Sequence, residues 1–107
     1  MWSVARQLER IDKKLLIKVE GETCVMQDIS KNGMRLMSRV LFKTQTVDIN
    51  FTMDDIEVEL QGQIRWIQKR PTVYDQAQYL VGVYLLDPPE EYIELVEKLS
   101  EESDRIN

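Results

Sequence analysis

The sequence predicts a mainly β protein, a small six-stranded antiparallel barrel followed by a C-terminal α-helix. Three observations support this prediction. Apolar and polar residues alternate with a period of two along much of residues 15–86, the pattern of strands with one buried face. Turn signals separate the alternating segments, and after residue 86 the apolar period changes to that of a helix. With 107 residues, we expect a single domain over 1–107.

The first part of the chain predicts an N-terminal segment and three short strands. Residues 2–11 are compatible with a short helix or an ordered arm ahead of the barrel. The alternation begins at residue 15 and stops at Gly21, where we expect the first turn. Residues 23–28 and 33–39 predict the second and third strands.

The next part predicts three more strands and one polar loop. Val47, Ile49 and Phe51 mark the fourth strand. The fifth, residues 56–66, alternates most clearly and places its even-numbered residues on one apolar face. Its length suggests a bend, which is easiest at Gly62. Residues 69–78 form a polar loop, and 79–87, apolar on both faces, predict a central sixth strand.

A helix is predicted over residues 87–105, with fraying near Ser103. Asp87 suits the N-cap, Pro88 the first helical position, and Glu90 completes a capping box. We therefore divide the domain into an arm (1–11), a barrel (13–86) and this helix. Closing the sheet into a barrel removes its exposed edges. The apolar stripe of the helix consists of Tyr92, Leu95, Val96 and Leu99.

The composition excludes several classes of function. The chain has no histidine and one cysteine, which rules out a His/Cys metal cluster and any histidine-dependent triad or general base. The acidic residues form no recognisable catalytic pair, so we expect no enzyme, cofactor or metal. No apolar run is long enough to span a bilayer, and no secretory signal is recognisable. A buried Cys24 thiol would suit a reducing compartment, which favours a cytoplasmic protein.

Two short motifs carry candidate binding residues. Asp28, Ser30 and Gly33 form the pattern D-x-S-x-x-G between the second and third strands. A turn explains this segment structurally, since Asn32-Gly33 is a strong hairpin signal and Asp28 and Ser30 could hydrogen-bond the local backbone. The second motif, R-x-x-x-R, precedes the first strand and consists of Arg6 and Arg10, which on a helix would otherwise be two solvated neighbours.

In this order and with this strand pattern, the two motifs resemble the PilZ domain family, and the resemblance covers nearly the whole chain. It implies a split β-barrel that binds the bacterial second messenger cyclic di-GMP (c-di-GMP). The implied ligand-binding residues are Arg6, Arg10, Asp28, Ser30 and Gly33. The resemblance also implies a flexible arginine-bearing arm that orders on the ligand and signals to a downstream protein partner.

The chemistry of these residues suits that ligand. Arginine can hold a phosphate bidentately, stack on a purine, or donate to guanine O6 and N7. Asp28 can accept hydrogen bonds from guanine, with the Ser30 hydroxyl beside it. Gly33 can adopt positive φ and admits a close approach of the ligand.

Three further residues need separate interpretation. Arg35 and Arg39 repeat the R-x-x-x-R pattern but lie in the third predicted strand, after the D-x-S-x-x-G motif, so we set them aside. Trp66 suits the core, the commoner place for a strand tryptophan. In the resembled family, a residue near this position can border the nucleotide, so Trp66 is also a candidate ligand border.

Two other functions compete with nucleotide binding. A PilZ-like adaptor would bind only proteins and no nucleotide. A small barrel could instead bind single-stranded RNA, but that requires several exposed aromatic residues along a basic groove. The chain carries a net charge of -5 and only 7% aromatic residues, so we expect no DNA or RNA partner and no membrane insertion.

Overall fold

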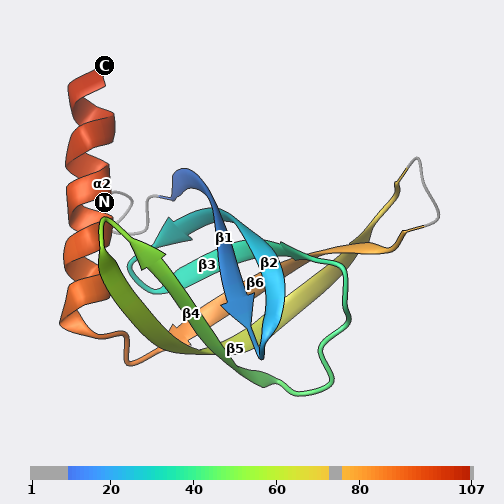
Figure 1. Cartoon of the computed structure of the whole chain (residues 1–107). Helices are drawn as coiled ribbons and strands as arrows, with labels where there is room; N and C mark the ends of the chain where they lie inside the picture. Colours follow the sequence, from blue (N-terminus) through green and yellow to red (C-terminus); the bar gives the residue numbers. More distant parts are fainter. Residues whose placement is uncertain (1–9, 73–75, 107) are drawn as a thin grey trace.

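The computed structural model of the protein describes residues 10–72 and 76–106. It is a closed barrel of six antiparallel strands in the order β1-β2-β3-β6-β5-β4, with one C-terminal helix (Figure 1), which confirms the predicted fold class. Most of the arm expected over 1–11, Arg6 included, lies outside the described residues. The elements are β1 (Ile11–Val19), β2 (Glu22–Ser30), β3 (Gly33–Ser38), β4 (Thr46–Met53), β5 (Ile56–Arg70), β6 (Gln78–Leu86) and α2 (Glu90–Ile106).

Two of the hairpins turn through two residues with positive φ. Glu20 and Gly21 have φ of 50° and 80° between β1 and β2, where the sequence predicts a turn. Asp54 and Asp55 have φ of 52° and 64° between β4 and β5. Positive φ at both central residues is the type I′ conformation, whose twist matches that of the flanking strands. These turns therefore favour the coiling that closes the barrel.

The core fills the barrel with inward-facing apolar side chains. Strand β6 pairs with both β3 and β5, and in a closed barrel every strand likewise has two neighbours. It contributes three of the buried side chains, while its Tyr84 and Leu86 are exposed on the outer surface. The buried residues of β6 are Val81, Val83 and Leu85.

β-bulges interrupt three strands and change the faces on which the following side chains lie. An extra residue in one strand of a pair shifts the alternation by one position. In β5 the bulge falls beside Arg65 rather than at the expected Gly62. A Cβ on Gly62 would come within 2.3 Å of Val83 Cγ1, so this glycine leaves room for a core side chain. The register shifts lie between Asp12 and Leu15, Met26 and Asp28, and Ile64 and Trp66.

The bulge in β5 places Trp66 on the outer surface. Unbroken alternation would point it inward with the other even-numbered residues, but the shift pairs it with Gly82. A Cβ on Gly82 would come within 2.2 Å of the indole, which shows that the ring lies directly against this glycine. Trp66 remains 42% exposed, so its expected place in the core is wrong.

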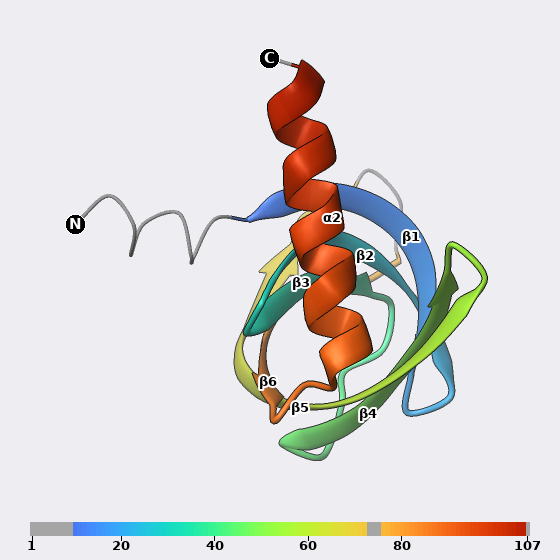
Figure 2. The same cartoon turned by 90° about the vertical axis from the view of Figure 1, so that its left-hand side faces the viewer.

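Helix α2 lies across one end of the barrel (Figure 2). Its predicted apolar stripe is buried, with Tyr92 at 0% exposure. The Tyr92 hydroxyl donates to the carbonyl oxygen of Ser30 at 2.7 Å and lies 3.4 Å from that of Gly33. The helix is therefore joined to the β2–β3 hairpin by a buried polar contact. Among the described residues, no helix is long and apolar enough to cross a membrane.

The helix begins at Glu90, three residues after the predicted N-cap. The carbonyl of Pro89 accepts from the amide of Ile93, so Pro89 takes the capping position. Asp87 has a φ of 46° and belongs to the turn after β6. The later start of the helix follows from Pro89. A residue that precedes proline disfavours the helical conformation, so Pro88 stays outside the helix.

Replacing Tyr92 with phenylalanine tests the buried hydroxyl contact. We expect Tyr92→Phe to lower the free energy of unfolding by about 1 kcal/mol, because the Ser30 carbonyl loses its buried donor. Urea denaturation measures the change. Tyr84→Phe is the matched control. The Tyr84 ring is exposed, so this variant should be as stable as the wild type. Equal stability of all three proteins would contradict the prediction.

Alkaline pH tests the same hydroxyl independently. Burial raises the pKa of Tyr92. The folded state therefore keeps the proton to higher pH than the unfolded chain, in which tyrosine titrates near pH 10. Stability from this group is present below about pH 10 and is lost as pH rises above it. Above that pH, the free energy of unfolding should fall more steeply in the wild type than in Tyr92→Phe. The same dependence of the free energy of unfolding on pH in the wild type and in Tyr92→Phe would refute this prediction.

Candidate functional site

The β2–β3 hairpin carries the D-x-S-x-x-G residues, but its turn differs from the expected one. Ser30 pairs with Gly33, so the turn residues are Lys31 and Asn32, not Asn32 and Gly33. Neither turn residue has positive φ, as in a type I turn, which favours glycine at its fourth position. Gly33 opens β3, and its φ is not positive either.

Space, rather than backbone conformation, explains the glycine at position 33. A Cβ here would lie 3.1 Å from the carbonyl oxygen of Val83, 3.5 Å from Arg10 Nη2 and 3.6 Å from Ser30 Oγ. The expectation of positive φ at Gly33 is therefore wrong. The space at Gly33 is taken by the neighbouring strand and by Arg10, and the expected close approach of a ligand stays a prediction.

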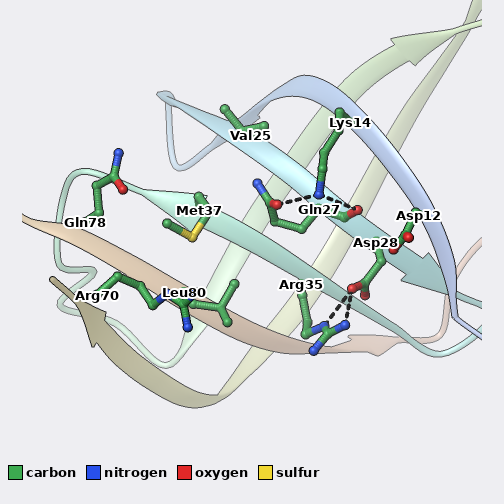
Figure 3. Close-up of a pocket in the computed structure, with 10 residues that line it drawn as sticks. All are labelled: Asp12, Lys14, Val25, Gln27, Asp28, Arg35, Met37, Arg70, Gln78 and Leu80. Carbon is green, nitrogen blue, oxygen red and sulfur yellow. Dashed lines mark hydrogen bonds and ion pairs between the residues drawn. The ribbon is translucent and has the colours of Figure 1, made fainter. Parts of the chain in front are cut away.

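Asp28 is a buried carboxylate with two arginine partners. Its side chain is 3% exposed, and Arg10 Nη1 lies 2.8 Å from Oδ1. Arg35 Nε donates to Oδ2 at 2.7 Å, and Arg35 Nη2 forms an ion pair with the same oxygen (Figure 3). Each oxygen thus has its own guanidinium. The Asp28 carboxylate accepts its hydrogen bonds from these arginines, so the alternative of a local Asx-turn is not the arrangement found.

Arg35 belongs to this cluster, so the expectation that it plays no part in the site is wrong. It lies directly opposite Asp28 in the β2–β3 pairing, and the hydrogen bond to Asp28 raises its pKa. Arg39 lies beyond the end of β3 and is exposed, so the two arginines do not act together. A signal for Arg35 was available in the sequence, because a hairpin turning at Lys31-Asn32 places position 35 across from position 28.

The remaining candidate residues divide between those near Asp28 and those outside the described structure. The Ser30 hydroxyl is buried and lies 3.1 Å from Asn32 Oδ1, so its bonding is local to the turn. Arg10 is exposed and joins Asp28 to the strand that follows the arm. Trp66 covers Gly82, which pairs with Arg35 on its other side. Arg6 lies outside the described residues.

A shallow depression of about 500 Å³ adjoins the Asp28–Arg35 pair on the outer face of the barrel (Figure 3). Strands β1, β2, β3, β5 and β6 all contribute to its wall. Among residues 10–72 and 76–106, no three His, Cys, Asp or Glu side chains gather in a way that could hold a metal ion. The site therefore offers hydrogen-bond donors, one paired carboxylate and apolar surface. The lining residues are Asp12, Lys14, Val25, Gln27, Asp28, Arg35, Met37, Arg70, Gln78 and Leu80.

Comparisons with known proteins agree with this architecture. Among solved structures, the chain is similar to the PlzA protein of Borreliella burgdorferi, crystallised in complex with c-di-GMP, with a TM-score of 0.66 and 13% identity. The match covers 96% of this chain and 53% of that one, so this chain spans about half of its length. At this identity the likeness shows the fold alone. No curated protein matches significantly.

A sequence model of the family described as PilZ domain matches residues 6–102. This range includes all six strands, most of α2, the R-x-x-x-R motif and the D-x-S-x-x-G motif. The chain therefore belongs to the PilZ domain family.

Proposed function

We propose that this PilZ domain is a receptor for c-di-GMP that binds the ligand at Arg10, Asp28, Ser30 and Gly33, with Arg6 from the arm. The observation that carries the proposal is the buried Asp28 carboxylate held by two guanidinium groups on the outer face of the barrel. The PlzA structure contains c-di-GMP, which supports the choice of ligand. No chemical step is required, and a cytoplasmic location fits the reduced Cys24.

The geometry suggests how the ligand would exchange with Arg10. Arg35 comes from the strand paired with Asp28, whereas Arg10 precedes β1 and lies outside the sheet; the two side chains are similarly exposed, 39% and 40%. If Arg10 turns to a phosphate, Oδ1 of Asp28 becomes available to the N1–H and N2–H groups of guanine. Arg35 still neutralises the buried charge, whose isolation would cost several kcal/mol. Arg10 is thus the exchangeable partner and Arg35 the permanent one.

The same exchange provides an output. Movement of Arg10 toward a phosphate would draw the preceding arm, with Arg6, onto the ligand and alter the surface beside β1. A downstream protein would recognise this altered surface. The rival function is an adaptor that binds proteins without nucleotide. Exposed Trp66, Tyr84 and Leu86 on the outer faces of β5 and β6 favour some role in protein contact.

Calorimetric titration with c-di-GMP decides between the receptor and the adaptor. We expect saturable binding of c-di-GMP and much weaker binding of cyclic di-AMP. Adenine presents an acceptor at N1, which would face the Asp28 carboxylate instead of donating to it. Absence of heat with high-micromolar c-di-GMP would refute the receptor and leave the adaptor.

Alanine variants of the arginines test the assigned residues. We expect Arg10→Ala and Arg6→Ala each to weaken c-di-GMP binding by about 2 kcal/mol, roughly thirtyfold in Kd, because a charge-assisted bond to the ligand is lost. Arg39→Ala is the control, since Arg39 is exposed beyond β3 and should bind like the wild type. Wild-type affinity in Arg10→Ala would show that the site has been assigned to the wrong residues.

A further inference from the structure

The depression beside Asp28 has an apolar floor that the proposed hairpin site does not use. Val25 on β2 pairs with Met37 on β3, and Met37 pairs with Leu80 on β6. Each of these side chains is half-buried on the outer face of the barrel. Neighbouring strands lie about 4.8 Å apart, so the row forms a continuous apolar strip across three strands. Such a strip offers one face of a planar base a surface on which to lie.

Polar groups surround this floor and give it a net positive charge. Three cations, Lys14, Arg35 and Arg70, line the depression against two carboxylates, Asp12 and Asp28, which leaves a charge of +1. The depression therefore combines apolar surface with hydrogen-bond donors, which is the usual composition of a small-molecule site.

Arg70 differs from the other two cations in its bonding. Lys14 Nζ donates to Gln27 Oε1 at 2.5 Å, and Arg35 is held by Asp28. Within the described part of the chain, Arg70 forms no hydrogen bond or ion pair. It lies opposite Gln78 near the ends of β5 and β6 (Figure 3). Its guanidinium donors are therefore available to a ligand seated on the floor.

The symmetry of the proposed ligand creates a need for a second base site. The two halves of c-di-GMP are identical, yet the hairpin offers a single guanine acceptor, Asp28. On the Arg70 side of the depression, the other guanine would present a different edge. Guanine O6 and N7 are both acceptors, and a guanidinium matches them bidentately.

We propose that the depression is a second base subsite of the c-di-GMP site. One guanine lies on Val25, Met37 and Leu80, and Arg70 donates to its O6 and N7 edge. The inference rests on the proposed function and adds a specificity-determining residue outside both sequence motifs. Tight binding would then require guanine in both halves of the ligand, because Asp28 accepts from one base and Arg70 donates to the other.

The test combines two proteins with two ligands. Arg70→Ala should weaken c-di-GMP binding about tenfold, the loss of one charge-assisted contact. The hybrid cyclic GMP–AMP has one guanine for Asp28 and an adenine that presents N6–H₂ where guanine presents O6. Wild-type protein should therefore bind the hybrid less tightly than c-di-GMP. Arg70→Ala should bind the two ligands with nearly equal affinity, because the residue that distinguishes them is gone.

Two further variants separate a specific contact from general charge. Lys69→Ala removes the same charge from the adjacent residue, which faces the opposite side of β5, and should bind like the wild type. Arg70→Lys keeps the charge and a donor for O6 but loses the planar fork, so its selectivity between the two ligands should lie between those of the wild type and Arg70→Ala. Circular dichroism confirms folding, which an exposed side chain should not affect.

The outcomes distinguish this inference from the proposed function. If wild-type protein does not bind c-di-GMP, the proposed function fails and this inference falls with it. If wild-type protein binds and Arg70→Ala matches Lys69→Ala in affinity and in selectivity between the two ligands, the second subsite is refuted while the receptor function stands.

Discussion

The buried carboxylate of Asp28 is the interaction on which the outer face of this barrel depends. A carboxylate that is almost inaccessible to water is tolerated only if it is paired and hydrogen-bonded. Here two arginines satisfy it, one preceding β1 and one from β3, so a single side chain joins three consecutive segments of the chain. The two partners differ in where they lie in the chain, since Arg35 is on the strand paired with Asp28 and Arg10 precedes β1. In the proposed function a ligand would replace Arg10, and Arg35 would keep the charge of Asp28 paired.

The outer face is assembled by irregularities in otherwise regular strands. The bulge in β2 places Met26 in the core and Asp28 on the outside, although the two residues are only two positions apart. The bulge in β5 similarly moves Trp66 outward onto Gly82. Bulges often lie beside binding sites because they redirect side chains at a small cost in pairing. In this barrel they bring polar groups and an aromatic ring onto one surface.

The other side of the hairpin is secured by the helix. Tyr92, fully buried in α2, donates to the Ser30 carbonyl, and Lys31 in the turn forms an ion pair with Glu97 on the same helix at 3.3 Å. The exposed ion pair adds little energy by itself, while the buried hydroxyl contact fixes the backbone of the motif. The hairpin is thus held by α2 at one end of the barrel and presents Asp28 on its outer surface. Preorganisation of this kind reduces the cost of ordering the site on binding.

The sequence by itself determined the strand count, the antiparallel barrel, the C-terminal helix and the family motifs, because alternation, helical periodicity and spacing are local properties. It did not determine the register. Placing the β2–β3 turn one residue late paired Asp28 with position 37 and concealed Arg35, and unbroken alternation put Trp66 in the core. Register and bulges depend on how neighbouring strands fit together around the core, as the contact between Val83 and Gly62 illustrates. Only the tertiary structure, through that packing, decided which side chains meet on the outer surface.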